Sequence, residues 1–287
     1  DIKVWLGDTN HLTILFLIME KINVMAVQME SAIDNRHKNF EKISNLIKNN
    51  IKDNTDIVIL PELWTVGWAC DKFTANAETF EESETVKFLS DMAKEYNVNI
   101  LGGSFVRKDG NKLFNTCPVI NRNGELIAHY DKNHLFSYYD DSENTYITEG
   151  KNPVMVSIDG IKIGLTICYD IRFPEIYRAY RKAGADILVN MAAWPLSRKI
   201  HWDSLTCARS VENQTYMIAL TQTGTLPTGA KNLGHSVIYD YSGNILDEID
   251  TVEGAIFAEL NIPEMYDFRN KCTVLKDLHE SYEVESL

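Results

Sequence analysis

Three residues with reactive side chains stand at or just past the ends of segments that have the pattern of β-strands. Glu62 follows the apolar run IVIL, Lys132 follows ELIAHYD, and Cys168 ends IKIGLTIC. In α/β proteins, ligands collect beyond the carboxyl ends of strands, where the last residue is held rigidly at the edge of a crevice. Taken singly, each residue has another explanation: Glu62 could cap a helix, Lys132 could be a surface charge, and Cys168 could be a core thiol.

Together, the three side chains match the requirements of amide hydrolysis. An amide is a poor electrophile, so its hydrolysis needs a nucleophile, a proton shuttle for the leaving amine and a positive group for the oxyanion. A cysteine where a strand enters a turn would expose its sulfur as a nucleophile elbow does, and the Tyr169 backbone N–H could donate to the same oxyanion. Lys132 favours the thiolate, and Glu62 can accept the thiol proton. We expect Cys168 to be the nucleophile, Glu62 the general base and Lys132 the oxyanion-stabilising cation.

The elements that must position these residues alternate between strands and helices, with antiparallel hairpins between them. Turn dipeptides at Asp109-Gly110, Asn123-Gly124 and Ser242-Gly243 indicate the hairpins. The expected strands are 22–29, 57–60, 99–106, 113–120, 125–131, 154–158, 161–168, 186–190, 216–222 and the hairpin 235–249, and the expected helices are 35–51, 85–96, 174–183 and 199–212. This order predicts an α/β protein with two sheets covered by helices on their outer faces.

Length and composition favour one domain. With 287 residues and 45% hydrophobic content, the chain can bury a large core, and we assign residues 19–265 to a single domain. We expect residues 1–18 to be an appendage outside the fold, although an extra terminal strand or helix is the alternative. The apolar run at 12–19 is too short to span a bilayer, and no convincing signal peptide precedes it. Residues 266–287 are expected to form a tail that is loose or lies on a partner subunit.

Charge and cysteine content exclude several classes of partner. The net charge of −13 disfavours nucleic acid, which is normally met by clustered Lys and Arg. The five cysteines are odd in number and scattered, which indicates a reducing cytoplasm and not a disulfide framework. The seven histidines show no HxH or HExxH spacing, so we expect no metal site.

Three strings around the reactive residues resemble a known family. LPELWTVGW, YDKNHLF and CYDIRFPEIYR are similar to the three signature blocks of the nitrilase superfamily of carbon–nitrogen hydrolases, in the same order and with comparable separations. The resemblance covers the chain from about residue 23 to residue 260. It implies a four-layer αββα sandwich, a Glu-Lys-Cys triad at Glu62, Lys132 and Cys168, no metal or organic cofactor, and a homodimer or higher homo-oligomer.

The resemblance also implies a second glutamate after the lysine block, seven residues before a glycine. Glu143 stands seven residues before Gly150 and is therefore preferred over Glu149. The surrounding loop, SYYDDSENTY, is shorter and more acidic than in many relatives, and a solvated loop carboxylate is the alternative for Glu143.

The residues after the nucleophile point to a branch of the family. CYDIRFPE resembles the Nit and ω-amidase branch, and WPLSRKIHWDSLTCARSVENQ resembles bacterial ω-amidases that hydrolyse 2-oxoglutaramate, whereas true nitrilases generally carry Cys-Trp-Glu. Small amides with a distal carboxylate become the leading substrates. Arg172, four residues after Cys168, could bind that carboxylate through a bidentate fork. The alternative is that Arg172 pairs with Glu175 or Asp170 to brace the turn.

Other residues near the blocks have weaker assignments. Trp194 and Trp64 are expected to form pocket walls, although both could equally be core aromatics. Arg209 and Glu212 stand three apart in a predicted helix, which indicates an ion pair that braces the site.

Competing functions remain open from the sequence alone. A glutaminase-type module that feeds a synthetase would need a P-loop and a second domain. A catalytically silent scaffold of the same fold would be expected to have lost a triad member, and all three are present. A hydrolase of other small amides or of N-carbamoyl compounds, and a histidine-assisted thiol hydrolase of another fold, are further alternatives.

Overall fold

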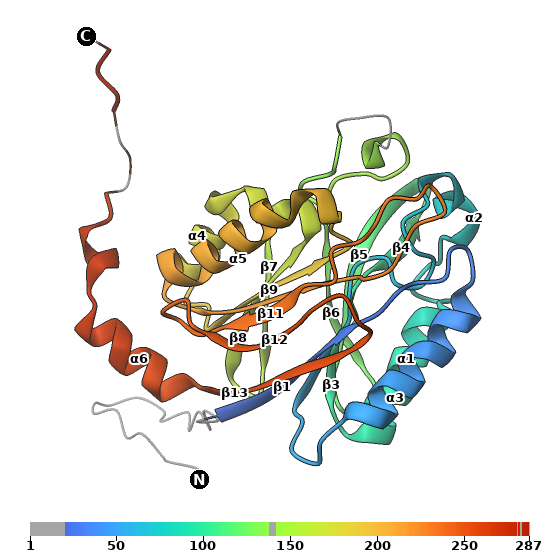
Figure 1. Ribbon diagram of the computed structural model, residues 1–287, viewed down its shortest axis with the longest axis horizontal. Coiled ribbons are helices and arrows are strands. Elements are labelled where there is room, and N and C mark those ends of the chain that lie inside the picture. The colour runs from blue at the N-terminus through green and yellow to red at the C-terminus, as the bar shows by residue number, and fades with distance from the viewer. Residues whose placement is uncertain (1–20, 138–141, 280, 282, 287) are drawn as a thin grey trace.

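The computed structural model describes residues 21–137, 142–279, 281 and 283–286 (Figure 1). The predicted appendage at 1–18 lies outside the described residues. Two β-sheets pack face to face between two pairs of helices, so the predicted αββα sandwich of two mixed sheets is confirmed.

The first sheet holds Glu62 and Lys132 near its strand ends. It has seven strands in the order β13-β1-β2-β3-β5-β4, with β6 also paired to β5. Strands β1, β2 and β3 run parallel, and the other pairings are antiparallel. The strands are β1 (Lys21–Gln28), β2 (Ile57–Ile59), β3 (Asn99–Leu101), β4 (Phe105–Asp109), β5 (Lys112–Ile120), β6 (Leu126–Asp131) and β13 (Gly254–Asn261).

The second sheet carries Cys168. Its six strands follow the order β12-β11-β10-β9-β8-β7, with β8, β9 and β10 parallel at the centre. The strands are β7 (Val154–Ile158), β8 (Ile161–Ile167), β9 (Ile187–Ala192), β10 (Tyr216–Thr221), β11 (Ser236–Tyr239) and β12 (Ile245–Ile249).

Strand alternation divides the apolar side chains between the layers. In β1, Val24 and Ala26 join the cluster between the two sheets, whereas Met25 and Val27 face the helices α1 (Arg36–Asn50) and α3 (Glu84–Tyr96). This division follows from the period of two along a strand. On the other side of the sandwich, α4 (Pro174–Lys182) and α5 (Lys199–Asn213) cover the second sheet (Figure 1). The short α2 (Phe73–Asn76) follows a 3-10 turn at Cys70–Lys72.

Side-chain caps explain why these helices begin where they do. Asn35 accepts a hydrogen bond from the Lys38 N–H at the start of α1, and Ser83 accepts one from Val86 at the start of α3. Such caps satisfy N–H groups that have no partner inside the helix.

The predicted strand at 99–106 is interrupted. Its residues form β3 and β4, which are separated at Gly102 and Gly103. Gly103 has φ of +64°, and a Cβ there would collide with the Pro61 carbonyl oxygen. The break therefore allows the chain to pass directly beside the segment that carries Glu62.

The C-terminal elements extend further than the predicted strands and helices. Strand β13 pairs with β1 over its whole length, and helix α6 spans Ile262–Lys271. The predicted boundary between residues 265 and 266 thus falls inside α6. Met265 and Arg269 of this helix are buried, and the described residues after it run away from the sandwich (Figure 1).

No helix in the described part of the chain combines the length and the apolar character needed to cross a membrane.

Candidate active site

Cys168 stands at a sharp bend where β8 ends. Its φ is +47°, in the left-handed region that non-glycine residues rarely adopt, and a 3-10 turn from Cys168 to Arg172 follows. Only 7% of the residue is exposed. The bend is the strained strand-to-turn geometry expected of a nucleophile elbow.

Three buried side chains hold this elbow in place through hydrogen bonds to its backbone. The Asp170 carboxylate accepts a hydrogen bond from the Ile167 N–H at 2.9 Å. The Arg209 guanidinium donates to the Ile171 carbonyl through Nε at 3.1 Å and Nη2 at 2.7 Å. The Asn190 amide donates to the Cys168 carbonyl at 3.4 Å. The elbow is thus tied to the rest of the second sheet and to α5.

Glu62 reaches the same place from the first sheet. It follows β2, and the next residue, Leu63, has φ of +45° and donates its N–H to Ser104 Oγ at 2.9 Å. The Gln222 amide donates to the Glu62 carbonyl at 2.6 Å, and the Ala193 N–H donates to Glu62 Oε2 at 2.8 Å. Partners on both sheets therefore hold the fully buried Glu62 carboxylate.

Lys132 lies between two carboxylates. Its Nζ is 2.9 Å from Glu62 Oε1 and 2.8 Å from Glu143 Oε2, and all three side chains have no exposed surface. Asn115 Nδ2 donates to both carboxylates, at 3.0 Å to Glu62 and 2.9 Å to Glu143. The predicted residues Glu62, Lys132 and Glu143 thus form one buried cluster.

Glu143 occupies the place expected of the second glutamate. It begins a 3-10 turn at Glu143–Thr145, and its Oε2 also accepts the Phe136 N–H at 3.0 Å. Glu149 is exposed and lies along a different groove. The structure therefore places Glu143, and not Glu149, beside Lys132.

Burial and charge set the ionisation of this cluster. Burial by itself lowers the pKa of Lys132, but Glu143 and Glu62 outweigh it and hold that pKa well above its usual value. Burial raises the pKa of Glu143, Lys132 opposes the rise, and the like charge of Glu62 adds to it. The positive charge of Lys132 thus interacts with the carboxylates of both Glu62 and Glu143.

The surroundings of the Cys168 thiol favour its neutral form. Burial raises its pKa well above the ordinary value, the nearby Glu62 carboxylate raises it further, and Lys132 lowers it. The Glu62 carboxylate and the Lys132 ammonium are both close enough to act on the thiol through their charges. A thiol near a carboxylate and an ammonium group can attack an electrophile while its proton moves to the carboxylate.

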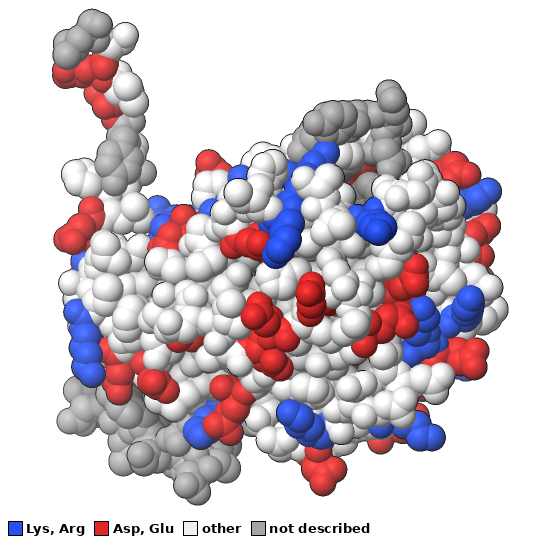
Figure 2. Space-filling view, in the orientation of Figure 1, with Lys and Arg blue, Asp and Glu red and all other residues white. Residues whose placement is uncertain are grey.

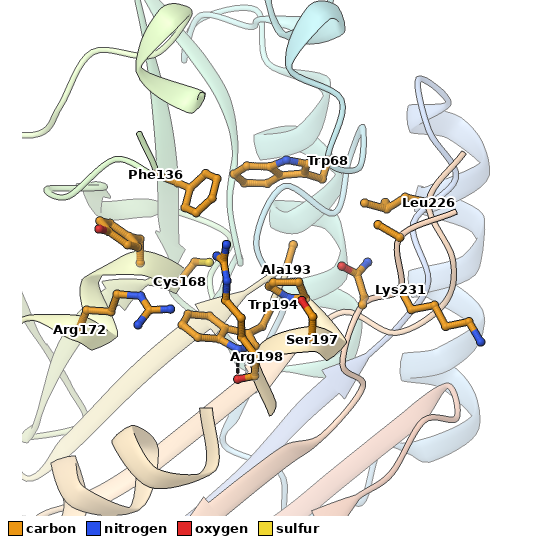
Figure 3. A pocket seen from close by; sticks show the side chains of 14 residues that line it. Trp68, Phe136, Cys168, Arg172, Ala193, Trp194, Ser197, Arg198, Leu226 and Lys231 are labelled. Atoms are coloured by element: carbon orange, nitrogen blue, oxygen red, sulfur yellow. Dashed lines mark hydrogen bonds between the residues drawn. The ribbon is translucent and has the colours of Figure 1, made fainter. Parts of the chain in front are cut away.

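A pocket of about 290 Å³ opens onto Cys168 (Figure 3). Much of its wall is formed by four aromatic side chains, those of Trp68, Phe136, Tyr169 and Trp194. Its lining includes Arg172, Arg198 and Lys231, and no Asp or Glu among the described residues. Although the net charge of the protein is −13, the charged residues that line this pocket are basic among those that the structure describes.

Three of the four predicted substrate-binding residues line the pocket, and one does not. Tyr169, Arg172 and Trp194 line the pocket. Trp64 does not: it is fully buried, donates its indole N–H to the Gly102 carbonyl at 2.8 Å and packs against aromatic rings of α1 and α3. Its alternative assignment as a core aromatic is the one that fits, because its side chain points to the outer face of the first sheet.

Arg172 does not brace the turn through a carboxylate. Asp170, one of its two predicted partners, instead accepts hydrogen bonds from Tyr130 and His134 at 2.6 and 2.8 Å. Arg172 Nη2 lies 3.3 Å from His201 Nδ1, and its buried Nε has no hydrogen-bond partner in the described structure. The predicted ion pair between Arg209 and Glu212 is present at 2.8 Å.

Several residues of the site were not predicted, among them Asn115, Trp68, Phe136 and Arg198. Asn115 could have been noticed in the sequence, because it is an amide in β5, a strand whose residues are mostly apolar. Trp68 stands in the same sequence block as Trp64, and only the packing decides which of the two faces the pocket. Phe136 and Arg198 come from turns whose course no local pattern specifies.

Within the described segments, no group of three or more His, Cys, Asp or Glu side chains is arranged to hold a metal ion.

Comparisons with known proteins agree with this geometry. Residues 23–270 match the carbon–nitrogen hydrolase family. The chain is 33% identical over 261 residues to a 2-oxoglutaramate amidase of Bacillus subtilis, covering 91% of this chain and 98% of that protein. It is also 33% identical over 267 residues to a 2-oxoglutaramate amidase of Paenarthrobacter nicotinovorans, covering 90% and 89%. Among solved structures, Nit3 of Saccharomyces cerevisiae, a member of branch 10 of the nitrilase superfamily, superimposes with a TM-score of 0.79 at 28% identity, covering 88% of this chain and 95% of that one.

Proposed function

The chain belongs to the carbon–nitrogen hydrolase family, and on that premise we propose that it is an ω-amidase that hydrolyses a small carboxylate-bearing amide such as 2-oxoglutaramate or 2-oxosuccinamate. The observation that carries the chemistry is the buried cluster of Glu62, Lys132 and Glu143 directly behind the Cys168 elbow. The named activity of relatives at 33% identity supports the choice of substrate.

In the first half of the proposed reaction, the Cys168 sulfur attacks the amide carbonyl carbon. Its proton passes to Glu62, whose carboxylate is close enough to act on the thiol. The carbonyl oxygen becomes an oxyanion that the Lys132 ammonium and the Tyr169 backbone N–H stabilise. Glu62 then gives the proton to the nitrogen, the C–N bond breaks, and ammonia leaves a thioester on Cys168.

In the second half, water replaces the amine. The water oxygen attacks the thioester carbon while Glu62 accepts a proton from the water. Lys132 again stabilises the oxyanion. The C–S bond breaks, and the sulfur takes the proton back from Glu62. The products are a carboxylic acid, ammonia and the starting enzyme. Glu143 acts in both halves by holding Lys132 in place.

The pocket favours a small substrate with a carboxylate. A volume of about 290 Å³ is just below the range that is usual for ligand pockets, roughly 300–1,000 Å³. The buried Arg172 Nε lacks a partner in the described structure, and a substrate carboxylate would satisfy it through a bidentate contact.

An ammonia-release assay tests the function. The substrates are 2-oxoglutaramate, 2-oxosuccinamate, glutamine, N-carbamoyl amino acids, simple aliphatic amides and nitriles, and the Cys168→Ala variant is the blank. We expect the highest kcat/KM on the two oxo-acid amides and no release above background from the blank. Equal signals from the native enzyme and the blank on every compound would show that the chain is a silent scaffold.

We also propose that the enzyme acts in the cytoplasm as a homodimer or higher oligomer. The free state of all five cysteines supports a reducing compartment.

A further inference from the structure

Arg198 enters the pocket from a segment that is fixed at its backbone. It ends a 3-10 turn at Leu196–Arg198, between β9 and α5. Its carbonyl accepts the Trp194 indole N–H at 2.9 Å, and its own N–H donates to Pro195 at 3.0 Å. The Leu196 N–H donates to the Lys231 carbonyl at 2.8 Å. The base of the Arg198 side chain is therefore held in one position.

The two guanidinium groups of the pocket rest on different aromatic walls. Arg172 lies 5.0 Å from the Trp194 ring centroid and 5.7 Å from that of Tyr169. Arg198 reaches the opposite wall, where its guanidinium is 5.2 Å from the Phe136 ring centroid. Figure 3 shows the Arg198 side chain rising across the pocket beside Cys168, with Arg172 on the other side of the sulfur.

Two guanidinium groups suit a substrate that has two neighbouring acceptors. A monoamide of a simple dicarboxylic acid offers one distal carboxylate, which a single guanidinium can bind. A 2-oxo acid monoamide carries an additional carbonyl oxygen next to that carboxylate. Each guanidinium is a rigid, permanently charged donor, so two of them on opposite walls can hold both acceptors in one orientation.

We propose that Arg198 is a specificity-determining residue that donates to the 2-oxo group of the substrate while Arg172 binds its carboxylate. The inference rests on the proposed amidase function and extends it, because it assigns the preference for 2-oxo acids to one residue outside the catalytic cluster.

The test compares two substrates of equal length, 2-oxoglutaramate and the monoamide of pentanedioic acid, which lacks only the oxo group. For the native enzyme we expect a higher kcat/KM on the oxo compound. Arg198→Met should lower the ratio of the two kcat/KM values by about 10- to 100-fold, the range expected for losing a hydrogen bond to a charged group. Arg198→Lys keeps the charge without the planar fork and should lose less of the ratio.

Lys199→Met is the matched control. Lys199 is the next residue, but its ammonium pairs with Asp203 at 2.8 Å and it does not line the pocket. This variant removes one positive charge close to Arg198 and should leave the ratio unchanged. Activity on the plain monoamide reports whether Arg198→Met folds correctly.

Two results would overturn the inference alone: a native enzyme that hydrolyses both compounds equally well, or an Arg198→Met variant that keeps the native ratio. A native enzyme that releases no ammonia from either compound would instead overturn the proposed function, and the inference with it.

Discussion

The Cys168 thiol should stay protonated in the free enzyme and lose its proton only when it attacks the substrate. Burial and the Glu62 carboxylate both raise its pKa, so the protonated form should persist through the ordinary thiol value of 9.0. We expect the ultraviolet absorbance of thiolate, taken as the difference between native enzyme and Cys168→Ser, to stay absent up to that pH.

Glu62→Gln is the informative comparison for this titration. It removes the carboxylate that repels the thiolate and leaves Lys132, which lowers the thiol pKa. Thiolate absorbance should therefore appear at a lower pH in this variant than in the native enzyme. An identical titration in both would mean that Glu62 does not act on the thiol.

Glu143 links the buried cluster to stability. Folding raises its pKa above the ordinary 4.5, so its contribution to stability is fully present below that value and is lost as pH rises through the folded pKa. Glu143→Gln cannot ionise. We expect the free energy of unfolding of the native protein, relative to this variant, to fall as pH rises from about 4.5 through the folded pKa, by about 1.4 kcal/mol for each unit by which the pKa is raised. Denaturant titrations over this range measure it, and a difference that grows with pH would contradict the direction.

Arg172 should control which amides are accepted. Its buried Nε has no partner in the described structure, so a carboxylate-bearing substrate gains a charge-assisted contact that a neutral amide cannot make. We expect Arg172→Met to lower kcat/KM on 2-oxoglutaramate by about 10- to 100-fold and to change it little on a neutral aliphatic amide. Arg122→Met serves as the control, because Arg122 pairs with Asp159 at 2.6 Å outside the pocket. Equal losses on both amides would remove Arg172 from substrate recognition.

At the level of elements, one side chain connects the nucleophile elbow to the segment after β6. Besides the Ile167 N–H of the elbow, Asp170 accepts the backbone N–H of His134 at 2.9 Å and the Tyr130 hydroxyl at 2.6 Å. Lys132 stands between these two partners in the chain. Asp170 therefore fixes the distance between nucleophile and cation, and it acts as a positioning residue.

Asp170→Asn should lower kcat more than it changes KM. The amide nitrogen cannot accept the hydrogen bonds that one carboxylate oxygen now takes, and a misplaced catalytic group slows the reaction steeply. We expect a roughly 10- to 100-fold loss in kcat with the preference among amides retained. Steady-state kinetics on two amides measure both quantities.

Asp186→Asn is the matched variant. Asp186 is also buried and accepts hydrogen bonds from the Lys162 N–H at 3.0 Å and the Tyr266 hydroxyl at 2.7 Å, but it precedes β9 at the end away from the site. It should destabilise the fold and leave kcat unchanged at temperatures where both variants are folded. If both substitutions lower kcat alike, Asp170 has only a structural role.

The sequence predicts these elements where their signals are local. The expected helix at 35–51 corresponds to α1 at Arg36–Asn50, because a capping asparagine and an apolar stripe define it. Helix α6 was missed although Asn261 caps it and a proline stands in its first turn. Strand β13 pairs with β1 more than two hundred residues earlier in the chain, and no local pattern reveals such a partner.

The site was predicted unevenly for the same reason. Residues at strand ends, such as Cys168 and Glu62, can be inferred because strand direction fixes where they emerge. Trp64 is a core aromatic and Trp68 lines the pocket, because the left-handed Leu63 and the packing of α1 and α3 decide which indole turns to the pocket. Arg198 depends on a turn held by Trp194, which is a tertiary contact.

At the scale of the whole molecule, the charge of the surface differs from the charge of the pocket lining. Acidic side chains are spread among basic ones on the face shown in Figure 2, consistent with a net charge of −13. The pocket lining departs from this average, since its charged residues are all basic among those described. A substrate would therefore meet charged groups of the opposite sign to the net charge of the chain.

Helix α5 offers a surface on which the predicted homo-oligomer can be tested. Ile200 and Val211 are 72% and 49% exposed, and they stand eleven residues apart, about three turns, on one face of the helix. A partner chain that packed on this face would cover both aliphatic side chains and remove their apolar surface from water. We expect the native protein to sediment as a dimer or larger, and the double variant Ile200→Asp, Val211→Asp to shift toward a single chain because the contact would bury two unpaired carboxylates.

Val252→Asp, at a residue 61% exposed between β12 and β13, adds a similar charge elsewhere and should keep the native mass. A double variant that sediments like the native protein would exclude this face of α5 as the contact, and a native protein that sediments as one chain would refute the oligomer itself.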